Sequence, residues 1–379
     1  MQDVYRIIAQ GEKIGLKLNT KKCEVLSRDN DFLNEFLSTL QGSKQIGLGD
    51  AIFLGAGLST TSSAKQLRNR VNKIKQSCAR LRQCEPHDAF WIVSRAAGSP
   101  KLIYLLRTSP CFLAQETVAE ADILLAQSFG ELFALNLTGD AWRQATLPAN
   151  FGGLSLPSVS SLILPCFLSS TNTAAALVGK VLNKRIGTID GIFEALAEWE
   201  HALEAPSRPQ TEMGSQRKLL LTLTEKRFND LLHSATEERS VAGLMCLSAE
   251  EAGAFMQGPA SSREKTKLYN AAFVCALRMR LGQQVAAPSK CDCGQDLDAQ
   301  GSHALVCRRG VGKHVRHSLI NDFIRREFNA AGLPVLLEPP GLSVRDGQRP
   351  DGVTVLPHTN GKALAWDATC INPLAPSYV

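Results

Sequence analysis

The sequence lacks the features that mark membrane-spanning, secreted and repeat proteins. Its longest apolar runs, residues 51–58 and 162–168, are far shorter than the roughly 18 residues that cross a bilayer, so we expect no membrane-spanning segment. The first residues show neither a basic leader nor an apolar centre, and we therefore expect no secretory signal. No internal repeat is apparent. These absences predict a nuclear or cytoplasmic protein without a membrane partner.

The cysteines do not form the pattern of a disulfide scaffold. Their number is eleven, which is odd, and they are scattered through 379 residues, which favours reduced thiols. Apolar residues make up 44% of the chain and charged residues 21%, which excludes a disordered or fibrous protein. The chain is long enough for more than one domain.

Basic residues are concentrated in two segments. Residues 64–107 contain ten Lys or Arg against two acids, and residues 261–330 contain twelve against six. The net charges of these segments, +8 and +6, leave −8 for the rest of a chain whose total is +6. Two basic segments within an otherwise acidic chain are typical of a protein with a polyanionic partner such as DNA or RNA.

The first basic segment begins with a predicted amphipathic helix. Its apolar residues recur at spacings of four and three from residue 64 on, and Ser62 or Ser63 is the expected N-cap. Arg68, Lys75 and Arg82 are seven residues apart, and residues with this spacing share one edge of a helix. The basic excess continues with Trp91 and Tyr104 interleaved, as is typical of nucleic-acid grooves, although a solvated face is the alternative. The candidate nucleic-acid-binding residues are Arg68, Lys75, Arg82, Arg95, Lys101 and Arg107.

Secondary-structure patterns elsewhere predict an α+β protein that is mainly α-helical. Alternation and turn residues predict short strands at 16–19, 24–26 and 51–58. Apolar spacing predicts helices at 192–203, 219–232, 265–281 and 314–330. The last residues are strand-like and rich in Pro and Gly.

Three cysteines and one histidine form the sharpest local motif. Cys291 and Cys293 are followed by His303 and Cys307, and this set matches the ligands of a structural zinc site. His303 and Cys307 are four residues apart, which places them on one helical face. The alternative is three reduced cysteines in a loop. His314 and His317 are reserve ligands.

Two aspartates lie in a predicted β-hairpin formed by residues 349–356 and 362–369. If the turn is centred on residue 359, Asp351 and Asp367 are directly opposed, about 5 Å apart on one face. Two carboxylates in that position could share a Mg²⁺ and activate water for phosphodiester cleavage, with Glu338 as a third acid. The alternative, that each aspartate only flanks a strand, is weaker for Asp367 because Asp is depleted within strands.

Taken together, these segments resemble the C-terminal part of a non-LTR retrotransposon reverse transcriptase, of the clade with a restriction-enzyme-like endonuclease. Residues 14–19 and 22–24 look like its primer-grip strands, and 53–56 like the Phe-Leu-Gly strand at the start of its thumb. Residues 104–110, 144–148 and 152–154 resemble stretches of its thumb and connector. The cysteine cluster corresponds to its zinc knuckle, and residues 349–351 with 366–369 correspond to its Pro-Asp and Asp nuclease motif.

The resemblance implies five segments. These are the end of a polymerase palm with the primer grip (1–60), a basic helical thumb (61–140), a helical connector (141–288), a zinc knuckle (289–312) and a truncated restriction-endonuclease-like α/β core (313–379).

The resemblance also implies what this chain lacks. Family polymerases hold two metal ions on a Tyr/Phe-x-Asp-Asp turn upstream of the primer grip, and we expect no polymerase activity from a chain without it. Many related nucleases place a lysine two positions after the second aspartate, where this chain has Thr369. In this clade the lysine comes from a following helix. Lys362 lies at an odd offset from Asp367 and is expected to face away.

The implied function is that of a fragment of an RNA-directed DNA polymerase and endonuclease that binds DNA and RNA during target-primed reverse transcription. In that function Arg68, Lys75 and Arg82 would contact phosphates, while Asp351 and Asp367 would bind Mg²⁺. Two alternatives are a non-catalytic nucleic-acid-binding protein derived from such an element and a zinc-stabilised interaction protein without a nucleic-acid partner.

Overall fold

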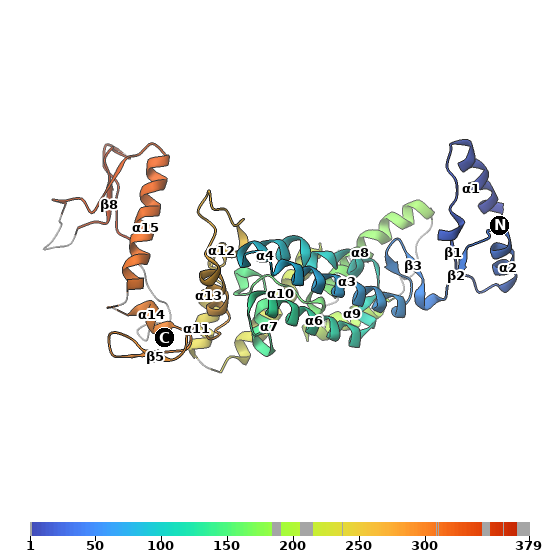
Figure 1. The fold of residues 1–379 in the computed structure, drawn as a ribbon, viewed down its shortest axis with the longest axis horizontal. Helices are drawn as coiled ribbons and strands as arrows, with labels where there is room; N and C mark the ends of the chain where they lie inside the picture. The colour runs from blue at the N-terminus through green and yellow to red at the C-terminus, as the bar shows by residue number, and fades with distance from the viewer. Residues whose placement is uncertain are drawn as a thin grey trace. The chain divides into compact units, whose positions relative to one another are not determined.

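The computed structural model describes residues 2–183, 191–204, 215–236, 238–307, 309, 311–342, 349–358 and 360–369. These residues form a mainly helical fold with short strands (Figure 1). The mainly α-helical α+β class predicted from the sequence is therefore confirmed. The chain divides into two compact units. Unit 1 comprises Met1–Ser234 and Ser248–Val274, and unit 2 comprises Ala235–Leu247 and Cys275–Val379.

The described α-helices are α1 (Gln2–Lys13), α2 (Asn30–Thr39), α3 (Thr60–Leu81), α4 (Pro86–Ile92), α5 (Ile103–Thr108), α6 (Gln115–Phe133), α7 (Gly139–Thr146), α8 (Val159–Leu182), α9 (Ile192–Leu203), α10 (Gln216–Ser234), α11 (Glu238–Leu247), α12 (Ala254–Gln257), α13 (Asn270–Arg280), α14 (Ser302–Val306) and α15 (Val311–Ala330). Short helical turns are η1 (Thr20–Lys22), η2 (Leu48–Asp50), η3 (Val93–Ala97), η4 (Ser99–Lys101), η5 (Cys111–Leu113) and η6 (Ala149–Phe151). The described strands are β1 (Glu24–Val25), β2 (Lys44–Gln45), β3 (Ile52–Phe53), β4 (Ala56–Gly57), β5 (Ser289–Lys290), β6 (Asp296–Leu297), β7 (Val335–Leu337), β8 (Gly352–Thr354) and β9 (Ala365–Trp366).

The N-terminal strands differ from the prediction. Residues 16–19 form no strand, and β1 pairs in parallel with β2, which follows α2. The stretch predicted as one strand at 51–58 is a hairpin, in which β3 pairs with β4. Its turn uses positive φ angles at Leu54 and Gly55, so the apolar run reverses direction instead of continuing.

Helix α3 begins at Thr60, before the first residue of its apolar pattern. Its N-cap is Ser59, whose Oγ accepts from the amide of Ser62 at 3.1 Å, while the Ser59 amide donates to Ser62 Oγ at 2.9 Å. This reciprocal capping box satisfies two amides that the first helical turn leaves free. The prediction of Ser62 or Ser63 as N-cap was therefore wrong, because the helix starts one turn before its buried face does.

The buried face of α3 is the predicted one. Leu67, Val71, Ile74 and Cys78 are almost fully buried, and α3 packs along α6. Around this pair, α5 and α10 pack against α8. The spacing of three and four residues thus places one apolar stripe in the core of unit 1 and leaves the rest of α3 at the surface.

Aromatic side chains hold the segment after α12 against α4. Phe90 lies 5.3 Å from Phe133 and 5.5 Å from Phe273, measured between ring centroids, and His87 stacks on Phe273 at 4.3 Å. Beside them, Lys267 forms ion pairs of 2.7 Å with both Glu85 and Asp88. Helix α13 starts at Asn270 rather than at the predicted residue 265, because residues 262–265 form a turn with a φ of +58° at Lys265 and Lys267 is held against α4 by its ion pairs.

Helix α8 is long and apolar enough to cross a membrane, and it is the one such helix among the residues described. Slightly more than half of its most apolar window, 53%, is buried inside the fold. Leu162, Ile163 and Leu168 belong to the core of unit 1. Buried core helices pass the same test of length and composition, so the finding is weak evidence for a membrane span.

Two further predicted helices are confirmed: α9 spans 192–203, and α10 contains the predicted 219–232. In unit 2, α15 begins at Val311 and so contains the helix predicted at 314–330. It packs against a three-stranded antiparallel sheet with the order β7-β8-β9. The sheet pairs Leu336 with Val353 and Val353 with Ala365.

Candidate metal centre and nucleic-acid interface

Four potential metal ligands come together in unit 2, as the sequence predicts. One ligand atom from each of Cys291, Cys293, His303 and Cys307 lies within 4.8 Å of the other three. The Sγ atoms of Cys291 and Cys307 are 3.6 Å apart, and Cys293 Sγ is 3.2 Å from His303 Nε2. Zinc bonds of about 2.0 to 2.3 Å in a tetrahedron place neighbouring ligand atoms roughly 3.3 to 3.8 Å apart. The group therefore has the composition and spacing to bind a metal ion such as Zn²⁺.

The local backbone explains how a one-residue spacing between cysteines suffices. Cys291 and Cys293 lie in the turn of the β5–β6 hairpin, where the Cys291 amide donates to Gln295 O at 2.9 Å. Residues 292 and 293 are in a turn, so the chain reverses direction between the two cysteines instead of running on as a strand. Gly294, with a φ of +90°, donates its amide to Cys291 O at 2.7 Å and closes the turn behind them.

The opposite half of the cluster is held by α14. Gly301 precedes it with a φ of +71°, and the Asp298 carboxylate accepts from the Ser302 amide at 2.6 Å. Cys307 ends the helix by donating its amide to His303 O at 2.9 Å. This bond fixes the two residues one turn apart, which brings both side chains to the hairpin.

The thiol of Cys307 is set up to ionise. Burial opposes ionisation, but hydrogen bonds from the Arg309 amide, the two neighbouring cysteines and His303 lower the pKa of Cys307 to about 7. Because the thiolate is the form that binds metal, this lowered pKa favours metal binding near neutral pH.

The reserve ligands lie elsewhere. His314 does not belong to the cluster, and His317 faces a different partner. The Nε2 of His317 lies 2.9 Å from Asp351 Oδ2, and its Nδ1 lies 3.4 Å from Asn321 Nδ2. Trp366 Nε1 donates to Asn321 Oδ1 at 3.0 Å. Each group can thus donate to the next, from Trp366 through Asn321 and His317 to the carboxylate.

Asp351 is the end point of this hydrogen-bond chain. The Ala368 amide also donates to Asp351 Oδ2, at 2.6 Å. Burial opposes ionisation of Asp351, but the Ala368 amide, Asn321 and His317 outweigh it and lower the pKa of the carboxyl. The structure therefore holds Asp351 as an ionised, firmly placed carboxylate between α15 and the sheet.

The predicted register of this hairpin is confirmed. Gly352 pairs with Trp366, the register of a turn centred on residue 359, and the same register carried one step further sets Asp351 opposite Asp367. The Trp366 ring covers Gly352 so closely that a Cβ there would lie 2.0 Å from it. Trp366 also stacks on Phe328 of α15 at 5.6 Å. Glycine at 352 is therefore required by the cross-strand tryptophan.

The three predicted acids are not among the described side chains that gather as potential metal ligands. Asp367 is exposed and forms no hydrogen bond or ion pair in the described part of the chain. Glu338 forms an ion pair with Arg349. Among the described residues, the Cys₃His cluster is the single group of three or more such side chains that could share an ion. The prediction of a Mg²⁺ site at Asp351 and Asp367 thus receives no support from the geometry.

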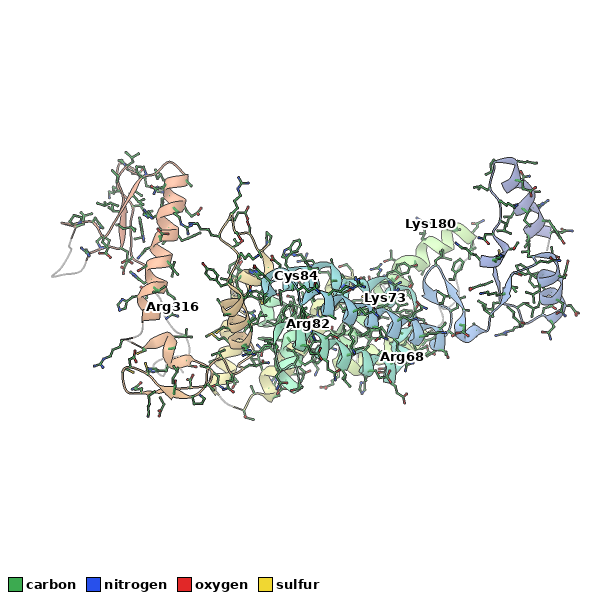
Figure 2. All side chains as sticks on the ribbon, viewed as in Figure 1. Arg68, Lys73, Arg82, Cys84, Lys180 and Arg316 are labelled. Carbon is green, nitrogen blue, oxygen red and sulfur yellow. The ribbon has the colours of Figure 1, made fainter. Side chains whose placement is uncertain are left out.

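The predicted basic row on α3 faces another helix. Arg68 forms an ion pair of 2.9 Å with Glu120, and Arg82 forms one with Glu131, both acids of α6. Figure 2 labels the two arginines. Lys75 is exposed between them and forms no ion pair with a described residue. Two of the three cations predicted to contact phosphate are therefore already neutralised within unit 1.

The remaining predicted cations also differ in their surroundings. Arg95 lies over the Trp91 ring at 5.5 Å and donates to Gln257 O. Arg107 is half-buried and donates to Gln216 Oε1 at 2.6 Å. Lys101 is exposed and donates to Ser77 Oγ at 3.2 Å.

A different face of α3 forms a polar groove of about 480 Å³. Its cations Arg70, Lys73 and Lys101 form no ion pair in the described residues, and the lining includes no acid. Lys73 is labelled on α3 in Figure 2. We call this the α3 groove, and it is lined by Gln66, Asn69, Arg70, Asn72, Lys73, Gln76 and Lys101.

The sequence contained a signal for this groove. Positions 66, 69, 73 and 76 are three or four apart and therefore share one helical face. α3 contains no Asp or Glu, so any exposed face of it is positive or neutral. The seven-residue spacing of Arg68, Lys75 and Arg82 points to the edge beside α6 instead, because the local pattern does not reveal the partner helix.

Comparison with known proteins gives no family. No family model matches the chain, and no curated protein matches it in sequence.

Proposed function

We propose that the chain is a nucleic-acid-binding part of a non-LTR retrotransposon reverse transcriptase, and that the α3 groove binds the phosphate backbone of a duplex. The observation that carries this proposal is the set of three unpaired cations, Arg70, Lys73 and Lys101, among four side-chain amides in a groove without acids. Cations supply the electrostatic attraction to phosphates, and amides can bond to phosphate, sugar or base edges.

The dimensions of α3 suit this partner. Its 22 residues span about 33 Å at 1.5 Å per residue, close to the roughly 34 Å of one turn of a DNA duplex. A helix of that length can lie along a groove of the duplex. In this proposal α3 belongs to a thumb, with the primer grip before it and the connector after it.

Unit 2 supplies the zinc knuckle of the proposal. The Cys₃His cluster holds the β5–β6 hairpin and α14 together, and α15 with the β7-β8-β9 sheet corresponds to a truncated nuclease core. The second basic segment, residues 261–330, reaches from the end of unit 1 into this region and adds positive charge.

A second candidate function is nucleic-acid binding without catalysis, in a protein derived from such an element. The engagement of Asp351 by His317 and the Ala368 amide, with Asp367 left exposed, favours this reading over an active nuclease. A carboxylate that already accepts several hydrogen bonds has less capacity left for a cation.

Binding tests the proposal through two matched sets of substitutions. Replacing Arg70, Lys73 and Lys101 by Gln should weaken duplex binding about tenfold or more, because each lost phosphate contact contributes on the order of 0.5 to 1 kcal/mol. Replacing Arg68, Lys75 and Arg82 by Gln removes the same charge and is the control, with a smaller expected effect. Fluorescence anisotropy with a labelled duplex measures both, and an unchanged affinity in the first set would overturn the proposal.

A nicking assay separates the two candidates. The full chain is incubated with supercoiled DNA and Mg²⁺ or Mn²⁺, beside the Asp351→Ala variant. The observed geometry predicts no metal-dependent nicking by either protein. Nicking by the wild type that disappears in Asp351→Ala would instead establish a nuclease and remove the non-catalytic reading.

A further inference from the structure

A second cavity, of about 310 Å³ and partly open to solvent, lies in unit 1 and is walled mainly by apolar side chains. It is formed where η4 and α5, the loop after α7, α8 and α10 meet. No residue of α3 lines it, so it is separate from the α3 groove. Its volume is at the lower end of the range for small-molecule sites. The principal apolar walls are Pro100, Ile103, Leu147, Leu162, Leu220 and Leu223.

One charged residue, Arg227 of α10, contributes to this wall. The side chain is half-buried, and it forms no hydrogen bond or ion pair in the part of the chain that the structure describes. Burial lowers the pKa of Arg227, although Asp122 and Asp230 act in the opposite direction. Because the guanidinium is half-exposed and has no partner among the described residues, it is available to an anionic group that enters the cavity.

The nearby acids are engaged with other groups. Asp122 accepts from the amides of Val159 and Ser160, at 2.5 and 3.2 Å, and thereby caps the N-terminus of α8. Asp230 forms an ion pair of 2.6 Å with Lys226. The charge of Arg227 is therefore balanced only at a distance within the protein.

We propose that this cavity binds a small amphipathic carboxylate, with its apolar body against the walls and its carboxylate on Arg227. The planar guanidinium matches a carboxylate with two parallel hydrogen bonds. Thr224 lines the same cavity one helical turn before Arg227 and adds a hydroxyl on the same face of α10. An aromatic or short aliphatic acid has the required combination of apolar bulk and one negative charge.

The test uses the full chain and two probes of equal shape, 2-naphthoate and the neutral 2-naphthalenemethanol. Titration followed by methyl NMR reports both affinity and location, because Ile103, Leu220 and Leu223 carry methyl groups in the wall. We expect their signals to shift on adding naphthoate, and we expect naphthoate to bind about tenfold or more tightly than the alcohol.

Two variants and a control decide the outcome. Arg227→Gln should abolish the preference for naphthoate while leaving the alcohol unchanged. Arg143→Gln removes the same charge from an exposed neighbour that pairs with Asp140, and it should retain the preference. Thr224→Phe narrows the cavity without changing its charge and should weaken the binding of both probes. This variant still tests the location of the site if Arg227→Gln does not fold. No naphthoate binding at millimolar concentration, or shifts confined to methyl groups outside the cavity, would overturn the proposal.

Discussion

Arg68 and Arg70 lie two positions apart on α3 and have opposite surroundings. Two residues turn the helix by about 200°, so the side chains leave it on opposite faces. Arg68 meets Glu120 of α6, whereas Arg70 lines the α3 groove and donates only to the carbonyl of Lys101, at 3.4 Å. An exposed ion pair contributes little stability, yet it cancels the charge that a phosphate would need. The position on the helix, more than the residue type, therefore decides which arginine is available.

His87 illustrates a buried titratable group that structure alone identifies. Its ring is 1% exposed, and its Nδ1 accepts from the Leu268 amide at 3.2 Å. Burial lowers the pKa of His87 below its ordinary value of 6.5. Protonation would place a second hydrogen against the Leu268 amide and charge a ring that stacks on Phe273.

We therefore expect unit 1 to lose stability as the pH falls below about 6.5, because the unfolded chain then binds a proton at His87 that the folded chain does not. The loss should be at most about 1.4 kcal/mol per pH unit from this group. Urea unfolding at pH 7 and pH 5 measures it. His87→Gln should flatten the dependence, while the exposed His233→Gln should not; equal profiles for all three proteins would contradict the assignment.

At the scale of elements, the Cys₃His cluster joins the hairpin β5–β6 to α14. These elements are short, and their described side chains are exposed or half-buried, so they bury little apolar surface. Metal binding to such a segment supplies on the order of 10 kcal/mol, which can replace a core.

We expect the purified chain to contain one zinc ion, and we expect Cys307→Ser or a chelator to unfold the segment around residues 289–307. Hydrogen exchange of its amides should accelerate while that of α3 does not change, and elemental analysis should show the lost zinc. Cys84→Ser, at an exposed cysteine outside the cluster, is the control. If the amides of residues 289–307 remained protected from hydrogen exchange after zinc removal, the cluster would not be a structural metal site.

The elements also show what sequence can and cannot predict. The register of β8 and β9 and the bounds of α9 follow from local rules, turn length and helical period, and both were predicted. The parallel pair β1–β2 and the ion pairs of Arg68 and Arg82 join residues separated by other elements, which no local pattern reveals. His317, only a reserve ligand by sequence, faces Asp351 in the fold.

At the scale of the molecule, positive charge is concentrated in two segments of the sequence, a pattern that led us to propose a polyanionic partner. The two basic segments carry an excess over an otherwise acidic chain, and one helix without acids contributes most of the first segment. Within unit 1, the acids of α6 neutralise one edge of that helix and leave the α3 groove positive. The proposed duplex binding thus depends on a single groove rather than on general basicity.

The most direct test is the salt dependence of duplex binding, measured for the wild type and the two triple variants. Each phosphate contact contributes about −0.9 to the slope of log K against log salt concentration. The account predicts that the slope becomes shallower by about 2.7 when Arg70, Lys73 and Lys101 are replaced by Gln, and changes by about 1 or less when Arg68, Lys75 and Arg82 are replaced. Equal changes in both variants, or a change only in the second, would contradict the assignment of the α3 groove.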